Sequence, residues 1–301
     1  MANSPRSEIA LDEDGLRQLL RRTLPHLAEL PLRLVAEGWD NATWRLGEEY
    51  AIRLPRRERA APLITHEQQA LPLIAPALSA VGVHTPLPIA SGTPDRHFPW
   101  PWSLLPWLPG ERALDRPVAE NRRWADQLAR TVLALHIPAP ENAPVNPVRG
   151  VPLADRDSTL RSRIGRLDSA TGDILREIWQ QGLDAPTSRE RVWIHGDLHP
   201  GNILIAEGHL SALIDFGDVT AGDPAYDLAV AWQVFDAAGR ERFRATLADR
   251  YDDATWMRAR AWAAAVAAIL LDESDDRDDF RALGRATADE LISERPETRA
   301  P

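Results

Sequence analysis

The stretch HGDLHPGNILIAEGHLSALIDFG, at residues 195–217, limits the possible folds of this chain more than any other. It contains two short apolar runs, ILIA at 203–206 and LSALI at 210–214, with only EGH between them. Short apolar runs joined by so few residues predict a β-hairpin. In an antiparallel hairpin the start of the first strand lies beside the end of the second. The hairpin therefore predicts that Asn202 and Asp215 lie at the same end, within reach of one ion.

A third polar residue, Asp197, lies on the loop just before the hairpin, five positions upstream of Asn202. Two carboxylates and an amide carbonyl directed into one cavity are hard oxygen ligands, which suit Mg²⁺. They would also crowd like charges together unless a cation were present. Phosphoryl transfer needs metal ions on the phosphates and a carboxylate that orients the attacking hydroxyl. Kinases use an Asp, an Asn five positions on and a DFG aspartate, and DFG occurs here at 215–217.

The N-terminal part of the chain has the pattern of an antiparallel sheet with one main helix. A short helix is predicted before the sheet, because Leu16, Leu19, Leu20 and Leu24 form one apolar stripe. The strands are then expected at 32–36, 43–47, 50–55, 85–92 and 102–110.

The main helix of this part is predicted in THEQQALPLIAPALSA, residues 65–80. Thr65 followed by Gln68 has the spacing of a capping box, which predicts that the helix begins here. Pro72 and Pro76 have no backbone N–H, so we expect them to kink or split the helix.

Helical patterns dominate the rest of the chain. An amphipathic helix is predicted in AENRRWADQLARTVLALHIP at 119–138, a proline-rich surface loop at 138–152, and more helix at 158–182. After the hairpin region, almost all of the pattern from 226 to 294 is helical.

The pattern changes near 106–110, where a predicted strand ends in PWLPG. We therefore expect two lobes: a nucleotide-binding lobe at 1–107 and a catalytic, substrate-binding lobe at 108–301. The fold class is α+β, with a small antiparallel-sheet lobe and a mainly helical larger lobe.

The segments WIHGDLHPGNIL and LIDFGDVTAGDPAYDLA resemble the aminoglycoside phosphotransferase family, whose fold is bilobal and protein-kinase-like. The resemblance extends from about residue 33 to residue 235. It implies that Asp197 is the catalytic base and that Asn202 and Asp215 bind Mg²⁺.

The same resemblance implies supporting roles for three further residues. His195 would brace the catalytic loop, as the corresponding histidine does in kinases. Asp223 and Asp227, in GDPAYDLA, resemble structural acids of the family that hold the catalytic loop. We expect a scaffold role for both, not a catalytic one.

A kinase also needs a cation on a strand, which grips the α- and β-phosphates and pairs with a Glu on the following helix. Arg53 in YAIRLP and Glu67 in THEQQA have these positions. The family more often has Lys on that strand, and Arg is bulkier and forked. A bidentate Arg–carboxylate pair is nevertheless chemically sound, so both residues are predicted to position the nucleotide.

The loop that would cover the phosphates is EGWDNATW, residues 37–44. It resembles the short loop of the phosphotransferase family, because it lacks the G-x-G-x-x-G of protein kinases. Backbone N–H groups of Asn41, Ala42 and Thr43 would face phosphate oxygens, as they do in anion-binding turns.

The segment WSLLPWLPGE resembles the hinge between the lobes of a kinase. By this analogy, adenine would bond to the carbonyl of Pro106 and the N–H of Leu108. Proline has no N–H but keeps its carbonyl, so position 106 can still accept. Leu105 would line the back of the nucleotide pocket.

These features predict transfer of the γ-phosphate of ATP or GTP, with Mg²⁺, to a small-molecule hydroxyl. A net charge of −10 argues against nucleic-acid partners and leaves room for a cationic substrate. An aminoglycoside is favoured, since polycations gain from the acidic C-terminal half, although the acidic run at 271–280 reads first as a solvated face.

Three alternatives stay open. A macrolide would need a more apolar cleft, which the Ala- and Trp-rich helix predicted at 256–271 could line. A metabolite kinase acting on an amino alcohol or a thiosugar is the second alternative. A pseudokinase that binds nucleotide without catalysis is the third, but it has no chemical need for all three of Asp197, Asn202 and Asp215.

No membrane partner is expected. The longest apolar run, AWAAAVAAILL at 261–271, is too short to cross a bilayer and predicts a buried helix. The sequence MANSPRSEIALDEDG at the N-terminus has no apolar core of the secretory type, so the default expectation is the cytoplasm. The absence of cysteine excludes disulfides and thiol catalysis.

Overall fold

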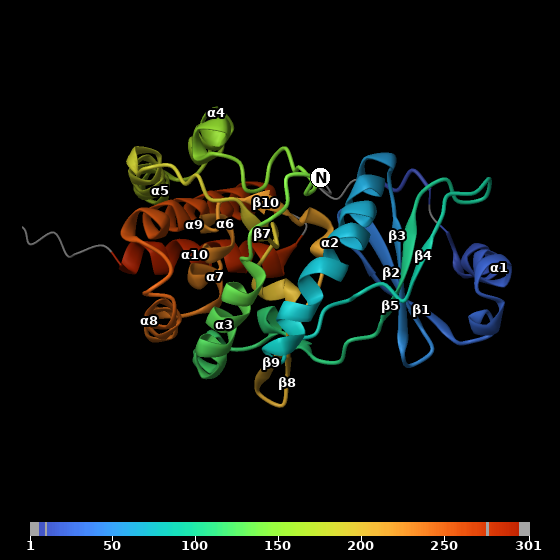
Figure 1. Ribbon diagram of the computed structural model, residues 1–301. Helices are drawn as coiled ribbons and strands as arrows, with labels where there is room; N and C mark the ends of the chain where they lie inside the picture. Colours follow the sequence, from blue (N-terminus) through green and yellow to red (C-terminus); the bar gives the residue numbers. More distant parts are fainter. Residues whose placement is uncertain (1–5, 10, 275–276, 295–301) are drawn as a thin grey trace, which may run out of the picture.

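The computed structural model describes residues 6–9, 11–274 and 277–294, which form a sheet-based N-terminal lobe and a mainly helical C-terminal lobe (Figure 1). Within the described residues, the N-terminal sheet has the strand order β1-β2-β3-β5-β4, and all neighbouring strands are antiparallel. The strands are β1 (Leu32–Glu37), β2 (Asn41–Leu46), β3 (Tyr50–Pro55), β4 (Ala90–Gly92) and β5 (Trp102–Pro106). The predicted α+β architecture is confirmed, although β4 covers only the end of the expected strand at 85–92.

One face of this sheet packs against helix α1 (Glu13–Thr23). Ile52 of β3 lies opposite Trp44 and Leu104 on the neighbouring strands, and directly paired residues share a face. All three side chains are buried in one core with α1. The buried residues of α1 are Leu16, Leu19 and Leu20, which confirms the predicted apolar stripe.

The other face of the sheet is turned toward helix α2 (Ala61–Ala80). Arg53 lies opposite Thr43 and Ser103, so all three residues belong to this face. Gln68 of α2 donates from Nε2 to Ser103 Oγ at 3.0 Å. The fold thereby brings α2 alongside the strand that carries Arg53.

Helix α2 differs from its prediction at both its start and its middle. It begins at Ala61, so Thr65 lies inside the helix and the expected capping box is wrong. Pro72 and Pro76 are expected to kink or split the helix; the split is wrong, since the helix runs through both. Both prolines lie on the exposed face, where water can solvate the carbonyls that lose their N–H partner.

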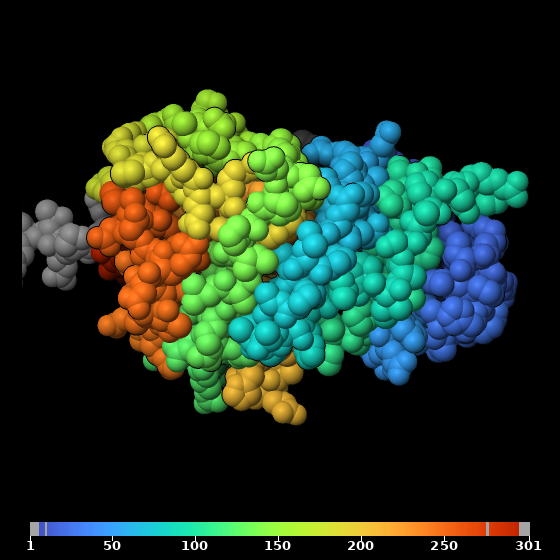
Figure 2. Space-filling view, viewed as in Figure 1, coloured from blue at the N-terminus to red at the C-terminus, as the bar shows by residue number. Residues whose placement is uncertain are grey.

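The opposite face of α2 connects the two hydrophobic cores. Leu71, Ile74 and Leu78 are fully buried, and they belong to the core of the C-terminal lobe. Figure 2 shows the surface of α2 lying directly against that of α3 (Ala125–Leu135). One helix therefore packs against the sheet and against the helical lobe.

The C-terminal lobe is built around helix α9 (Asp253–Glu273), which packs against α5 and α10. The helices that surround it are α4 (Asp157–Ile164), α5 (Ser169–Asp184), α6 (Ala225–Leu228), α7 (Ala231–Val234), α8 (Ala237–Thr246) and α10 (Asp278–Ser293). The helix expected at 119–138 begins as a 3-10 turn at Val118–Trp124, and the one expected at 158–182 is interrupted between α4 and α5. In the described part of the chain, no helix is both long enough and apolar enough to cross a bilayer.

The predicted hairpin is confirmed as β8 (Ile203–Ala206) and β9 (His209–Leu213), with β6 (Glu111–Arg112) pairing beside β8. Its turn residues, Glu207 and Gly208, both have positive φ, as tight hairpin turns require. The Ile214 N–H donates to the Asn202 carbonyl at 3.0 Å, which continues the ladder past the strands. This bond brings the ends of the hairpin together, as the sequence predicts.

Candidate active site

The loop that carries Asp197 lies between β7 (Val192–Ile194) and β8, and β7 pairs with β10 (Thr220–Gly222). The buried ring of His195 donates from Nε2 to the Ile214 carbonyl at 3.0 Å and accepts at Nδ1 from the Asp197 N–H at 3.2 Å. His195 therefore ties the start of the loop to the residue before Asp215, which is the bracing geometry expected from the sequence.

The buried carboxylate of Asp227 binds the backbone at the start of the same loop. Its Oδ2 accepts from the His195 N–H at 2.7 Å, and its Oδ1 accepts from the Gly196 N–H at 3.1 Å. His136 contacts Asp227 Oδ2 through Nε2 at 3.2 Å and the Tyr251 hydroxyl through Nδ1 at 2.7 Å. Asp227 thus satisfies two backbone donors that burial would otherwise leave without partners.

The sequence predicts that Asp223 holds the loop of Asp197, but its hydrogen bonds go to other segments. Its carboxylate accepts from the buried Arg258 of α9, with Nε at 2.6 Å, and from the Ala225 N–H at 3.0 Å. These bonds anchor the start of α6 to α9, and the hydrogen bonds that hold the loop of Asp197 come from Asp227.

Asp197 and Asn202 face one another across the loop. Asn202 donates from Nδ2 to the Asp197 carbonyl at 2.9 Å and to Asp197 Oδ2 at 3.3 Å. The amide nitrogen is thereby used within the loop, and Oδ1 is the atom left for another partner. Asp215 has left-handed backbone angles, φ 64° and ψ 65°, and its side chain is 49 % exposed.

Arg53, the cation predicted in the small lobe, contacts Asp215 directly. Arg53 donates from Nη1 to Glu67 Oε2 at 2.8 Å and from Nη2 to Asp215 Oδ1. Glu67 Oε2 also accepts from the Phe216 N–H at 3.0 Å. The expected Arg53–Glu67 pair therefore forms, and both of its members also bind the DFG segment.

Burial and charge shift the pKa values of Arg53 and Glu67 in opposite directions. Burial lowers the pKa of Arg53, but the carboxylates of Asp215 and Glu67 outweigh it, so the guanidinium pKa is raised. Burial also raises the pKa of Glu67, and Arg53 opposes that rise. Arg53 is thus a permanent cation at the edge of the site.

Asn41 and Thr43 lie in strand β2, between β1 and β3, and not in a phosphate-covering loop. Their backbone belongs to the sheet ladder, and the turn between β1 and β2 is only 38–40. With its amide turned toward the guanidinium, Asn41 Oδ1 accepts from Arg53 Nη2 at 2.9 Å and Nε at 3.2 Å. The structure therefore gives Asn41 a side-chain contact with Arg53 that the sequence did not suggest.

The hinge segment follows directly from β5. Leu105 lies opposite Ala51 and shares the face of Ser103, which is also the face of Arg53. Pro106 pairs with Tyr50, and the next N–H, that of Trp107, donates to the Glu49 carbonyl at 2.7 Å. The Trp107 N–H is therefore already used, while the roles of Pro106 and Leu108 toward a nucleotide stay predictions.

Three further side chains surround Asp197 in the site. Arg149, from the proline-rich loop, lies 3.3 Å from Asp197 Oδ1 through Nη2 and 3.2 Å from Asp218 Oδ2. His199 Nε2 lies 3.5 Å from Asp197 Oδ2, and its Nδ1 accepts from the Gly201 N–H. Asp218 directly follows DFG, and His199 lies four residues after His195 in HGDLHPGN, a spacing that indicates loop bracing rather than a metal site, while Arg149 has no signal in the sequence.

The electrostatics of the two acids differ. Burial would raise the pKa of Asp197, but Arg149 first and then His199 outweigh it, so the pKa is lowered. For Asp218 burial dominates, and Asp197 and Asp215 add repulsion, so its pKa is raised although Arg149 opposes this. Asp197 is therefore an anion beside a second, less acidic carboxyl.

These donors fit a hard divalent cation. Asn202 Oδ1 and the half-exposed Asp215 carboxylate lie at one end of the hairpin, and both are oxygen ligands of the kind Mg²⁺ takes. Burial first, and then repulsion from Asp197 and Asp215, raises the pKa of Asp218, so three carboxyl groups lie close enough here to influence one another. Two protein ligands leave the other positions of an octahedral ion to water and phosphate.

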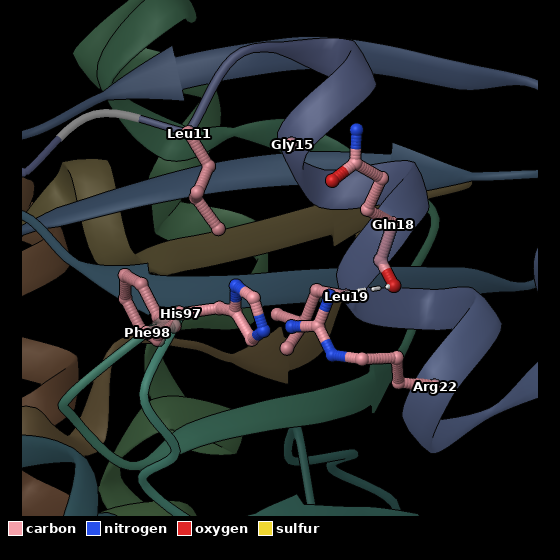
Figure 3. Close-up of a pocket in the computed structure, with 7 residues that line it drawn as sticks. All are labelled: Leu11, Gly15, Gln18, Leu19, Arg22, His97 and Phe98. Atoms are coloured by element: carbon pink, nitrogen blue, oxygen red, sulfur yellow. Dashed lines mark hydrogen bonds between the residues drawn. The ribbon is translucent and has the colours of Figure 1, made fainter.

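A separate cavity of about 130 Å³ lies on the α1 side of the sheet, away from this group (Figure 3). Arg22 crosses it and donates to the Gln18 carbonyl at 3.1 Å. The other lining residues are Leu11, Gly15, Leu19, His97 and Phe98. This face is the one opposite Arg53, so the cavity plays no part in the site.

Comparison with known proteins links this geometry to a family. Residues 31–262 match the model of the phosphotransferase enzyme family, APH. A homoserine kinase of Gluconacetobacter diazotrophicus is 37 % identical over 89 residues, and one of Methylocella silvestris is 26 % identical over 220 residues. The matches cover 29 % and 67 % of this chain, and the chain spans 26 % and 64 % of the length of these two relatives.

Solved structures show the same fold. The GDP and kanamycin complex of APH(2")-IIIa matches with a TM-score of 0.71 and 22 % identity, covering 92 % of this chain and 98 % of the other. The macrolide 2'-phosphotransferase MphH from Brachybacterium faecium matches with a TM-score of 0.64 and 24 % identity, covering 95 % and 100 %. The predicted bilobal, kinase-like fold is thereby confirmed.

Proposed function

We propose, from the premise that this chain belongs to the phosphotransferase enzyme family, that it transfers the γ-phosphoryl group of ATP or GTP to a hydroxyl of an amino-bearing small molecule. One observation carries the proposal. The Arg53–Glu67 pair of the small lobe binds the Asp215 segment, at the same hairpin end as Asn202 and near Asp197. Arg53, which would bind the nucleotide phosphates, and Asp197, which would orient the acceptor hydroxyl, thus lie in one site.

In the proposed reaction Asp197 accepts a hydrogen bond from the acceptor hydroxyl. The hydroxyl oxygen forms a bond to the γ-phosphorus, and the bond from that phosphorus to the β–γ bridging oxygen breaks. The hydroxyl proton passes to Asp197, and the nucleoside diphosphate leaves. The lowered pKa of Asp197 makes it a weak base, so orientation of the hydroxyl is its main contribution.

The nucleotide would lie between Arg53 and the hinge. Arg53, set by Glu67, faces the phosphates, and the Pro106 carbonyl and Leu108 N–H take the purine, with Leu105 behind it. Asn202 and Asp215 would hold Mg²⁺, which supplies positive charge to the phosphates when bound. The structures of relatives with GDP and with ATP support a purine donor.

We favour an aminoglycoside as the acceptor, because the chain carries a net charge of −10 and its site groups three carboxylates. The neighbouring structures that contain kanamycin, streptomycin or gentamicin support this choice.

A second acceptor class, a macrolide, has one specific observation in its favour. Val145 and Val148, which flank Asn146 on the loop of Arg149, are 74 % and 38 % exposed. Apolar side chains that stay exposed beside a polar site can contact an apolar ring. An amino alcohol is the third class, supported by the two homoserine kinases.

The test is release of nucleoside diphosphate from Mg·ATP and Mg·GTP, with kanamycin, erythromycin and homoserine as acceptors. We expect release that depends on the acceptor, stops on chelation by EDTA and is lost in Asp197→Ala. Nucleotide binding without turnover on any acceptor would favour a pseudokinase. Equal turnover by Asp197→Ala would refute the role of Asp197.

A further inference from the structure

We infer that Arg149 is a positioning residue of this catalytic centre, which holds the Asp197 carboxylate in register with the acceptor by bridging it to Asp218. The inference rests on the proposed role of Asp197. It adds a residue from a loop outside the catalytic and DFG segments.

The guanidinium of Arg149 is bound on every nitrogen. Nη2 lies 3.3 Å from Asp197 Oδ1 and donates to Asp218 Oδ2 at 3.2 Å. Nε donates to the same Asp218 oxygen at 3.3 Å, and Nη1 donates to the Tyr226 hydroxyl at 2.8 Å. A planar fork with this many fixed contacts has one orientation, so the edge turned toward Asp197 is fixed as well.

The backbone beneath Arg149 is fastened to the same acid. Asn146 donates from Nδ2 to Asp218 Oδ1 at 2.7 Å, and its Oδ1 accepts from the N–H groups of Val148 and Arg149 at 3.0 and 3.1 Å. The Asn146 N–H donates to Thr220 Oγ1 at 3.2 Å. Arg149 is therefore held at both its backbone and its side chain by residues of the segment that follows DFG, from Asp218 to Tyr226.

The next residue closes the loop onto the catalytic segments. Gly150 has φ +63°, and a Cβ there would lie 2.6 Å from Ile194 Cδ1 and 3.1 Å from Gly222 Cα. Ile194 ends the strand that leads into the Asp197 loop, and Gly222 ends the strand that leaves DFG. Only glycine fits this close approach, so the register of Arg149 against the site is built into the fold.

The chemistry explains why an arginine is needed. Asp218 repels Asp197, and an unpaired Asp218 would attract the acceptor's amino group away from the reacting hydroxyl. Arg149 neutralises Asp218 and leaves Asp197 Oδ2, which His199 and Asn202 also contact, as the oxygen that faces the acceptor. A lysine carries its three donors on one nitrogen, so it would lose the separate bonds that Nε makes to Asp218 and Nη1 makes to Tyr226, and with them the fixed orientation of the fork.

The experiment compares Arg149→Gln, Arg149→Lys, Asp218→Asn and the double variant Arg149→Gln/Asp218→Asn in the full-length protein. The assay uses kanamycin as the acceptor and, in parallel, the slow hydrolysis of Mg·ATP and Mg·GTP, in which water replaces the acceptor. Arg123→Gln, an exposed arginine of the same lobe, is the matched control. Nucleotide affinity and Tm are measured for every variant.

We expect Arg149→Gln to lower kcat by about 10–100-fold with little change in nucleotide affinity, because displacing a reacting group costs rate and not nucleotide binding. Arg149→Lys should recover only a small part of the rate. The double variant should have a higher kcat than Arg149→Gln, because the uncompensated charge of Asp218 is then gone.

Two results would overturn the inference: unchanged kcat in Arg149→Gln, or a loss of kcat explained fully by a lowered Tm or by weaker nucleotide binding. Asp197→Ala in the same assay separates the two proposals. If Asp197→Ala is inactive and Arg149→Gln is normal, only the role of Arg149 fails. If Asp197→Ala is fully active, the role of Asp197 fails, and the inference that rests on it fails with it. If the wild-type protein turns over nucleotide neither alone nor with kanamycin, erythromycin or homoserine, the proposed function fails, and so does the inference.

Discussion

Arg53 on β3 pairs directly with Asp215 at the end of the hairpin, so the cation of the small lobe and the DFG aspartate neutralise one another. Because Arg53 also holds the fully buried Glu67, this one guanidinium links a strand, a helix and the DFG segment. A bound metal ion and phosphates would compete for both members of the Arg53–Asp215 pair. We therefore expect binding of a nucleotide at this site to rearrange these charges.

Replacing Arg53 with Met should destabilise the protein by about 3–5 kcal/mol, because Glu67 is left as a buried charge without its partner. Arg53→Lys keeps the charge but loses the fork, so we expect a smaller loss of stability and about tenfold weaker nucleotide binding. Urea unfolding and nucleotide titration measure the two effects. A double variant, Arg53→Met with Glu67→Gln, should recover part of the stability, and no recovery would contradict the explanation.

Asp227 and Asp223 form a natural pair for comparison. Asp227→Asn should leave one of the two backbone donors of the catalytic loop unpaired, at a cost of about 1–3 kcal/mol, and lower kcat by about 10–100-fold. Asp223→Asn loses its ion pair with Arg258 but does not touch that loop, so stability should fall while kcat stays within about threefold. Steady-state kinetics and thermal unfolding separate the two; equal effects on kcat would refute the distinction.

Two glycines with positive φ test the packing of the Arg149 loop. Gly150→Ala meets Ile194 and Gly222, so we expect a loss of about 1–3 kcal/mol and a fall in kcat through displaced Arg149. Gly208→Ala has φ +80° but nothing within 4 Å, so only backbone strain of about 1 kcal/mol is expected, with normal kcat. Chemical denaturation and kinetics give both quantities. Normal kcat in a folded Gly150→Ala variant would show that the loop tolerates the shift.

The free energy of unfolding should depend on pH through Asp236, the N-cap of α8. The hydrogen bond from Arg122 lowers the pKa of this carboxyl in the folded protein. A lowered folded-state pKa means stability that is present above the ordinary value of about 3.9 and is lost as the pH falls through the folded-state pKa.

Asp236→Asn retains a capping oxygen but loses the charge, so it isolates this term. We expect the variant to be less stable than the wild-type protein at pH 7, and the difference to shrink toward pH 3. Tm measured across this range gives the comparison. A difference that is constant with pH would mean that the ion pair with Arg122 contributes nothing.

The parts of the site that the sequence predicts are those held by local pattern. The hairpin, the spacing of Asp197 and Asn202, and the Asp215 segment all lie within the one stretch 195–217, so short-range rules place them. The pairing of Arg53 with Glu67 followed from a strand and a helix that are consecutive in the chain.

The missed features depend on contacts between distant segments. Arg149 lies in a loop without periodicity, and only its packing against β7 and β10 brings it to Asp197. The predicted start of α2 at residue 65 was wrong, and the helix begins at Ala61, because burial of its apolar face outweighs local capping signals. Asn41 and Thr43 were assigned to a loop because no local signal showed that β2 begins at Asn41.

The placement of α2 limits how the two lobes can move. Its C-terminal half lies in the core of the helical lobe, while Gln68, earlier in the helix, is hydrogen-bonded to the sheet. The sheet cannot slide along the axis of α2 without pulling Leu71, Ile74 and Leu78 out of this core. Rotation of the sheet about that axis would leave these three side chains buried. Any closure of the two lobes over the proposed nucleotide site would therefore have to be a rotation whose axis passes close to Glu67.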